Sequence, residues 1–335
     1  MNILVFGKDG QLGKAFKTVF DASKAGEVHH IKYVSRAECD LSNSEAIVEL
    51  LNQIKPDLLI NAAAYTEVDK AETAVDLAYA INAKAPEVMA MYAKHHGATF
   101  LHYSTDYVFD GSKKVPYLES DIRNPLGVYG KSKAAGEEAI EAIFKTHHYS
   151  NAEIRDAEQK AQCAILRTSW VYGDGGNFIH TILSLAKERE TLKVITDQYG
   201  VPTSANWLAE VSLALVLNER HQLKSFPSGI YHAVPSGQTT WHGLATLAVE
   251  SAIQAGALLK AKPEAIKPIL AVEYPLPAAR PMNSRMATDK LRKVLVNQLV
   301  NASDSYNRFN SLADFPKWDA LVREYVRKHV ADKVI

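Results

Sequence analysis

The N-terminal segment constrains the fold of this chain most strongly, because an apolar run leads directly into a glycine-rich turn. Residues 2–6 read NILVF, a run that is typical of a strand buried on both faces of a parallel sheet. Gly7, Gly10 and Gly13 follow with the spacing GxxGxxG, and residues 14–25 have the pattern of a helix. A strand, a glycine turn and a helix in this order predict the first unit of an α/β fold that binds a dinucleotide. A glycine-rich turn without a ligand has a similar pattern.

Apolar runs and helical segments continue to alternate after this first unit. The further apolar runs occupy residues 29–34, 57–61, 98–103 and 163–167. Their alternation with helical segments predicts a doubly wound parallel sheet of the Rossmann type. Ligands of such sheets bind at the carboxyl ends of the strands, and Gly7, Ala62 and Thr105 are expected at that edge.

The second half of the chain has shorter and more mixed elements. We predict an NAD(P)-binding domain at residues 1–172, to which later segments at about 192–240 return. Residues 173–335 are predicted to form mainly a smaller mixed α/β lobe that binds the substrate and is interleaved with the first domain. The polar segment 146–162 is predicted to be a partly helical insertion on the surface.

The residues after the second apolar run bear on the choice of cofactor. Many NAD-binding proteins place an acidic residue there to bind the ribose hydroxyls, whereas this chain has Ser35 and Arg36. Serine and arginine suit a 2′-phosphate, so the sequence predicts that NADP(H) is accommodated, with NAD(H) still open. A solvent-exposed Arg36 without a ligand is the alternative.

Tyr129 and Lys133 form the strongest candidate for chemistry. Residues i and i+4 of a helix share one face, and an ammonium there is expected to lower the pKa of the phenol. Tyr129 is therefore a candidate proton donor near neutral pH. Thr105 follows the fourth apolar run, and its hydroxyl could share a substrate oxygen with Tyr129. Such a pair is common on solvated helices, but the predicted position beside the ligand-binding edge favours an active site.

Composition and charge exclude several classes of protein. Lys and Arg number 38, as do Asp and Glu, so the formal net charge is zero and no basic field is available for nucleic acid or an anionic membrane. Cys39 and Cys163 lack a CxxC spacing and are expected to be buried thiols. The sequence shows no signal peptide and no apolar run of about 18 residues, so we expect a cytoplasmic protein.

Several longer runs resemble one family. They read GKDGQLG at the start, INAAAYTEVDKAE at 60–72, HYSTDYVFDG at 102–111, NPLGVYGKSKAAGE at 124–137, RTSWVYGDGGNF at 167–178, DQYGVPT at 197–203 and ARPMNSRM at 279–286. Together they resemble the extended short-chain dehydrogenase/reductases, and within that group the dTDP-4-dehydrorhamnose reductases. The resemblance spans nearly the whole chain.

The resemblance implies a reaction and a set of site residues. The expected reaction is reduction of the C4 ketone of dTDP-4-dehydro-L-rhamnose by NAD(P)H, with the sugar nucleotide as the small-molecule partner. The catalytic triad would be Thr105, Tyr129 and Lys133. The cofactor-binding residues would be Gly7, Gly10, Gln11, Leu12, Gly13, Ser35, Arg36, Asp40, Leu41, Ala62, Ala63, Ala64, Tyr129 and Lys133. The substrate-binding residues would be Thr105, Asp106, Trp170 and Arg280.

The resemblance leaves metal use and oligomeric state open. Members of the family are sometimes described as magnesium-dependent, with acidic residues near a dimer contact. This chain has Lys14 and Ala15 early in the first helical segment and no evident acidic cluster, so we predict no metal site. A monomer and a homodimer both remain possible.

Three related functions are alternatives. Sugar-nucleotide dehydratases read Thr-Asp-Glu where this chain reads Thr105, Asp106 and Tyr107, so the second acid/base group of an elimination is missing. Sugar 4-epimerases usually lack that Asp and retain their cofactor tightly. A non-catalytic regulatory subunit, resembling that of methionine adenosyltransferase, could keep both the tyrosine and the lysine.

Overall fold

A parallel sheet forms the centre of the molecule. The computed structural model describes residues 1–23, 25–146, 152–300 and 314–332. Within this part of the chain the main sheet has six parallel strands in the order β10-β5-β4-β3-β1-β2. The strands are β1 (Asn2–Phe6), β2 (His30–Val34), β3 (Leu58–Asn61), β4 (Thr99–Thr105), β5 (Gln162–Thr168) and β10 (Gly229–His232). The doubly wound α/β fold predicted from the sequence is confirmed.

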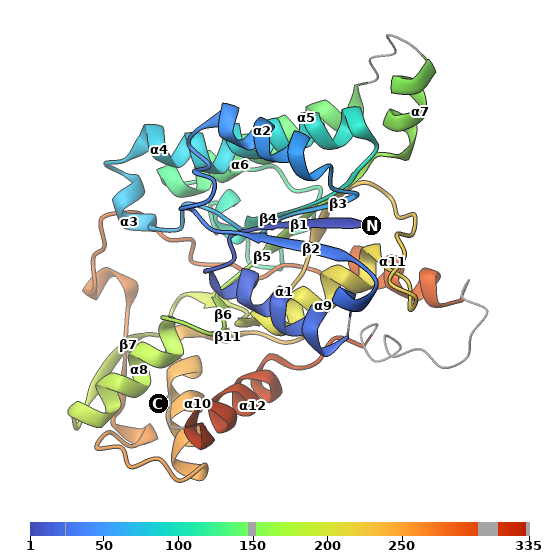
Figure 1. Cartoon of the computed structure of the whole chain (residues 1–335). Helices are drawn as coiled ribbons and strands as arrows, with labels where there is room; N and C mark the ends of the chain where they lie inside the picture. The colour runs from blue at the N-terminus through green and yellow to red at the C-terminus, as the bar shows by residue number, and fades with distance from the viewer. Residues whose placement is uncertain (24, 147–151, 301–313, 333–335) are drawn as a thin grey trace.

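Helices cover both faces of this sheet (Figure 1). One face packs against α2 (Ser44–Ile54), α5 (Ala85–His96) and α6 (Val128–Lys145). The other face packs against α1 (Gln11–Ala22), α9 (Ala205–Val216) and α11 (Asp289–Val300). Strand residues alternate between the two layers, as neighbours on a strand must. On β4, for example, Phe100 belongs to the first layer and Leu101 to the second.

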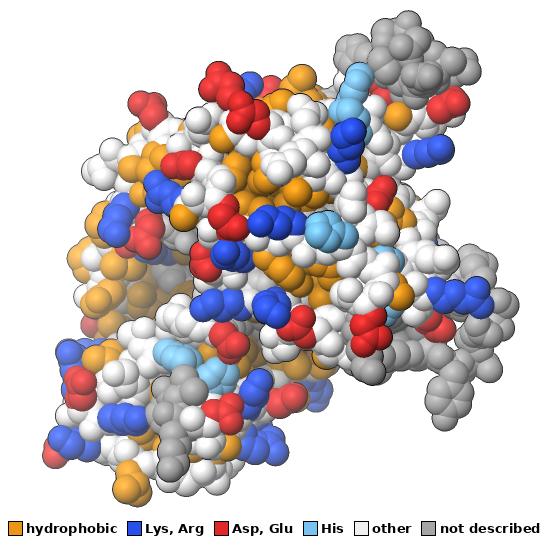
Figure 2. All heavy atoms as spheres, viewed as in Figure 1, with side chains coloured by type: hydrophobic (Ala, Val, Ile, Leu, Met, Phe, Trp, Pro, Cys, Tyr) orange, Lys and Arg blue, Asp and Glu red, His pale blue; other side chains and the backbone are white. Residues whose placement is uncertain are grey.

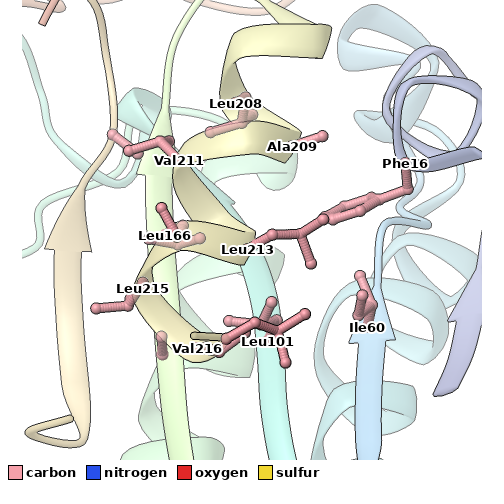
Figure 3. Packing of buried hydrophobic residues seen from close by; sticks show 14 of the residues in the cluster. Phe16, Ile60, Leu101, Leu166, Leu208, Ala209, Val211, Leu213, Leu215 and Val216 are labelled. Carbon is pink, nitrogen blue, oxygen red and sulfur yellow. The ribbon is translucent and has the colours of Figure 1, made fainter. Parts of the chain in front are cut away.

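The α9 helix lies across the middle of the sheet. Its apolar residues face the strand residues Leu101 and Leu166 and the ring of Phe16 from α1, as Figure 3 shows. Leu208 and Val211 are 0% exposed. This helix is buried on most of its circumference, which explains why the segment 205–216 is almost wholly apolar.

A second group of elements has its own core. The helices α8 (Phe178–Glu188), α10 (Trp241–Gln254) and α12 (Trp318–Ala331) pack with the parallel pair β7 (Leu192–Ile195) and β12 (Ile266–Ile269). Figure 1 shows this group below the main sheet. Short strand pairs connect the two parts: β6 (Val171–Tyr172) with β9 (Thr203–Ser204), and β8 (Tyr199–Gly200) with β11 (Thr239–Thr240).

The helical region between β3 and β4 is divided. It comprises α4 (Val75–Tyr79), a π-helical turn η2 (Ala80–Lys84) and α5, with the shorter α3 (Val68–Ala71) before it. Pro86 has no backbone N–H, and it lies in the first turn of α5, where a missing donor costs least. The remaining short helices are η1 (Ala25–Glu27), η3 (Asp106–Val108), η4 (Pro263–Ala265) and η5 (Ala271–Glu273).

The polar segment 146–162 contains a helix, as predicted, at α7 (Ala152–Lys160), which packs near α5. Residues 147–151 of this segment lie outside the described residues. Cys39 and Cys163 are free and buried, as expected. Among the described residues no helix is both long enough and apolar enough to cross a membrane. Acidic and basic side chains are interspersed over the face shown in Figure 2, in keeping with the balanced charge.

Candidate active site

The glycine turn after β1 folds as the sequence predicts. Gly7 has a φ of 86°, and a Cβ added there would lie 2.8 Å from the backbone nitrogen of Ala63. A Cβ at Gly13 would lie 2.1 Å from the carbonyl oxygen of Gly7, so this glycine lets α1 pack closely on the turn. Gly10 is the N-cap of α1, and no described side chain caps that end. The first N–H groups of α1 are therefore free to bind an anion such as a diphosphate.

A cleft of about 660 Å³ opens beside this turn. Thirteen of the predicted cofactor residues line it: Gly7, Gly10, Gln11, Leu12, Ser35, Arg36, Asp40, Leu41, Ala62, Ala63, Ala64, Tyr129 and Lys133. Gly13 does not line the cleft and packs beneath the turn. Lys14 and the loop at residues 174–176 also line the cleft. Its length, from the end of β2 to α6, and its glycine floor fit a dinucleotide.

The end of β2 carries a small network of charges. The backbone N–H and the hydroxyl of Ser35 donate to one oxygen of Glu38, at 2.9 and 2.8 Å. Lys8 binds the same carboxylate at 2.7 Å, and these contacts hold the pKa of Glu38 well below its ordinary value. Arg36 is exposed and lies 3.8 Å from Asp40. The cations that could meet a 2′-phosphate are thus present, but Glu38 already binds Lys8.

Lys133 is held deep in the site by β4. Its side chain is 1% exposed, and its Nζ donates to the carbonyl oxygen of Tyr103 at 2.6 Å and lies 3.3 Å from Nε2 of His102. Burial lowers the pKa of Lys133 to about 8, while Glu137, one turn further along α6, opposes that shift. With a pKa of about 8, Lys133 exchanges its proton more readily near neutral pH than an exposed lysine does.

Tyr129 departs from the expectation drawn from its spacing to Lys133. Burial raises the pKa of Tyr129 to about 12, and a hydrogen bond with the Thr105 hydroxyl opposes this rise only in part. The prediction that Lys133 lowers this pKa is wrong for the structure as it stands. The reason is geometric, because Lys133 donates its hydrogen bond to the Tyr103 carbonyl oxygen of β4 and burial dominates the ionisation of Tyr129.

Thr105 and Asp106 lie at the carboxyl end of β4 and are buried. The Thr105 hydroxyl donates to Oδ1 of Asp106 at 3.0 Å and accepts from the backbone N–H of Tyr107 at 3.2 Å. Burial raises the pKa of Asp106 to about 6. Hydrogen bonds therefore join Asp106 to Thr105 and Thr105 to Tyr129, and Tyr129 lines the cleft.

The four predicted substrate residues, Thr105, Asp106, Trp170 and Arg280, are not among the residues that line the cleft. Trp170 has a φ of 48° and stacks on Trp241, with ring centroids 3.7 Å apart and an interplanar angle of 15°. Arg280 forms two hydrogen bonds with the carboxylate of Asp69, at 2.7 and 2.8 Å. The guanidinium predicted to bind the sugar nucleotide is thus already paired with a carboxylate from α3.

Sequence reasoning missed three buried polar residues of the site. His102 contacts Lys133, and Asn61 contacts His102. Asn82, in the π-helical turn, accepts from the backbone N–H of Tyr65 at 2.9 Å and donates to Ser132 at 3.1 Å. His102 and Asn61 interrupt apolar strands, and that interruption was the available signal. Asn82 stands in an ordinary helical pattern and gives none.

Metal ligands are not grouped in the part of the chain that the structure describes. Among those residues no set of three or more His, Cys, Asp or Glu side chains could hold a metal ion.

Comparisons with known proteins agree with one another. A family model described as the RmlD substrate binding domain matches residues 1–309. A dTDP-4-dehydrorhamnose reductase from Salmonella typhimurium is 42% identical over 298 residues, which cover 88% of this chain and 91% of that protein. A dTDP-4-dehydrorhamnose reductase from Clostridium acetobutylicum has a crystal structure similar to this one, with a TM-score of 0.78, 31% identity and coverage of 97% and 98% of the two chains. The corresponding values for the Bacillus anthracis enzyme in complex with NADP are 0.77, 28%, 97% and 98%.

Proposed function

Because this chain belongs to the dTDP-4-dehydrorhamnose reductase family, we propose that it reduces the C4 ketone of dTDP-4-dehydro-L-rhamnose with NAD(P)H, giving dTDP-L-rhamnose. The observation that carries the proposal is the meeting of Tyr129 and Lys133 with the glycine turn in one cleft. The 42% identity to a reductase over 88% of the chain supports the same substrate.

The cofactor would lie along the cleft from β2 to α6. The N-terminus of α1 would hold the diphosphate, and the alanine run at 62–64 would leave room for the rest of the molecule. Ser35 and Arg36 would face the adenosine ribose. Lys133 would bind the nicotinamide ribose. The cofactor supplies hydride when it is bound.

The protein's own groups would handle the proton. Tyr129, whose pKa of about 12 keeps it protonated at neutral pH, would donate its proton to the C4 oxygen as negative charge develops there. The Thr105 hydroxyl has one proton, which Asp106 accepts at 3.0 Å in this structure. With the substrate bound, Thr105 would turn that proton to the same oxygen, and its hydrogen bond with the phenol would hold Tyr129 in place.

The two groups of elements would bind different ligands. Residues 1–172, with segments from about 192–240, would hold the cofactor, and residues 173–335 would mainly hold the sugar nucleotide. The separate core of α8, α10 and α12 supports this division, as does the return of β10 to the main sheet. Trp170, and Arg280 with its partner Asp69, would border the substrate between them.

The test is a turnover assay with both cofactors. Purified protein incubated with dTDP-4-dehydro-L-rhamnose should oxidise NADPH or NADH, seen as absorbance loss, and dTDP-L-rhamnose should form in equal amount. Cofactor binding measured in parallel provides the control. Tight cofactor binding without oxidation of NADPH or NADH and without product would contradict the reductase proposal and favour a regulatory role. Light scattering on the same sample distinguishes a monomer from a homodimer.

A further inference from the structure

A buried histidine links Lys133 to the sheet. His102 is 1% exposed, and its Nε2 lies 3.3 Å from Nζ of Lys133. Its Nδ1 lies 3.2 Å from Nδ2 of Asn61, which is 0% exposed. Asn61 and His102 are register partners on β3 and β4, so the sheet itself sets their separation. The three side chains form a continuous chain from α6 through β4 to β3.

The orientation of Asn61 determines which nitrogen of His102 carries a proton. The side-chain oxygen of Asn61 accepts from the backbone N–H of Ala63 at 3.2 Å, so its NH₂ group faces the imidazole. An NH₂ group only donates, and Nδ1 of His102 must therefore offer its lone pair. Burial and the nearby Lys133 lower the pKa of His102 well below its ordinary value, so the ring is neutral. Its single proton must then be on Nε2, facing Lys133.

This tautomer acts on the charge of the lysine. An Nε2–H group cannot accept a hydrogen bond from an ammonium. A hydrogen bond across the 3.3 Å between His102 and Lys133 needs a lone pair on Nζ, and only the neutral amine has one. A neutral amine still has hydrogens to donate to the Tyr103 carbonyl oxygen. The arrangement of His102 and Asn61 thus favours uncharged Lys133.

We propose that His102 is a positioning residue that favours the neutral form of Lys133, through the imidazole tautomer that Asn61 imposes. The proposal rests on the proposed function only in assigning Lys133 to the reduction. Glu137 favours the opposite, charged form from the same helix. Further titratable or charged groups about Lys133 and Glu137 are Tyr129 on α6, Tyr103 on β4, Asp106 at the start of η3, Arg167 on β5, His232 on β10, and Arg123. Arg167 and Arg123 both bind Glu137, and these two ion pairs weaken the attraction between the Glu137 carboxylate and the Lys133 ammonium.

The tautomer can be measured directly on the whole protein. Nitrogen-15 NMR of histidine-labelled protein separates protonated from unprotonated ring nitrogens, and His102→Gln identifies the resonances of this ring. We expect an unprotonated Nδ1 and a protonated Nε2 at neutral pH. A proton on Nδ1, or a doubly protonated ring, would overturn the proposal. The measurement needs no substrate, so its outcome is independent of whether the protein proves to be a reductase.

A second measurement tests the effect on the lysine. Carbon-13 NMR of labelled lysine side chains follows the titration of Lys133, with Lys133→Met identifying its resonance. In Asn61→Asp the new carboxylate accepts from Nδ1–H, so Nε2 becomes an acceptor and the titration midpoint of Lys133 should rise by about one pH unit. His102→Gln, whose amide oxygen can turn toward the ammonium, should also raise it.

The matched control is His242→Gln, which removes an imidazole hydrogen bond to the Ile266 carbonyl oxygen in the other core. It should leave the midpoint of Lys133 unchanged. An unchanged midpoint in folded Asn61→Asp and His102→Gln contradicts the proposed coupling. If neither variant folds, the His102 tautomer measured in the parent protein is the result that supports or contradicts the proposal.

Discussion

Tyr129 is a half-buried phenol with its pKa raised to about 12, so it enters the reaction protonated. Tyr129→Phe keeps the ring and removes the proton. Turnover should fall about 10²- to 10⁴-fold, because general acid catalysis is lost, while the dissociation constant for NADPH stays nearly the same. Stopped-flow turnover and fluorescence titration of the cofactor measure the two effects. Tyr172→Phe, which removes the hydroxyl of a buried tyrosine in the other core, is the control. Undiminished turnover in Tyr129→Phe would remove Tyr129 from the chemistry.

Asp106 is a second residue whose burial should have a measurable effect on the free energy of unfolding. It is 2% exposed, and burial raises its pKa from 3.8 to about 6. A carboxyl with a raised pKa stabilises the fold below its unfolded pKa, and that stability is lost as pH rises through the folded pKa. Relative to Asp106→Asn, the parent should therefore lose about 2 kcal/mol of unfolding free energy between pH 4 and pH 8. Urea unfolding at the two pH values measures this difference.

The control for that experiment is Asp76→Asn, since Asp76 is exposed on α4. Its difference from the parent should stay nearly flat over the same range of pH. Equal stability of Asp106→Asn and the parent at pH 8 would mean that the buried carboxylate is better compensated than its surroundings suggest.

At the scale of single elements, the turn after β2 offers a test of cofactor choice. Glu38 accepts both Ser35 hydrogen bonds and pairs with Lys8. Its negative charge therefore neutralises part of the positive charge available to a 2′-phosphate. Glu38→Gln should lower the KM for NADPH relative to that for NADH by roughly fivefold, with the effect shrinking at high salt. Steady-state kinetics with both cofactors measures it. Glu87→Gln, which removes a partly exposed carboxylate paired with Lys84, should leave the ratio unchanged.

Elements whose local pattern agrees with their packing were predictable. The NILVF run and the glycine turn specify β1 and the start of α1 by themselves, because only a strand buried on both faces and a backbone free of Cβ atoms fit there. Boundaries shifted by up to three residues, as with α1, which begins at Gln11 instead of 14. The helical pattern begins one turn into the helix, because the first turn consists of residues that serve the cleft.

Most residues that line the cleft were predictable from the sequence, whereas the contacts behind them were not. Motif spacing brings Tyr129 and Lys133 to the cleft, but the pKa of each depends on what lies behind it in the fold. The contact between His102 and Lys133 joins residues from two elements, and no spacing along the chain encodes it. The pairing of Arg280 with Asp69 joins residues 211 positions apart in the sequence. A sequence pattern cannot show that a charge is already neutralised.

At the scale of the whole molecule, one aromatic contact joins the main sheet to the second core. Trp170, at the carboxyl edge of the sheet, stacks on Trp241 at the start of α10. Trp170→Ala should lower the unfolding free energy by about 2–4 kcal/mol, because it removes a large ring from a packed pair. Trp241→Phe, which retains an aromatic partner, should cost less.

Thermal unfolding of both tryptophan variants, with the KM for the sugar nucleotide measured alongside, separates two roles. Loss of stability with an unchanged KM would show that Trp170 contributes to packing and does not bind the sugar nucleotide. A raised KM in Trp170→Ala, together with a normal KM in Trp241→Phe, would place the Trp170 ring against the sugar.

The position of α9 has a consequence for how the protein is made. This helix covers Leu101 and Leu166 on one face of the sheet, yet it is synthesised after α8 and β7, which belong to the other core (Figure 3). While a ribosome is still translating residues 173–204, the strands β1 to β5 are complete, and α1 is the helix already made on the face that α9 will cover. Newly made chains therefore expose an apolar surface to the cell for the time that this stretch takes to emerge, and a truncated product ending there would keep it exposed.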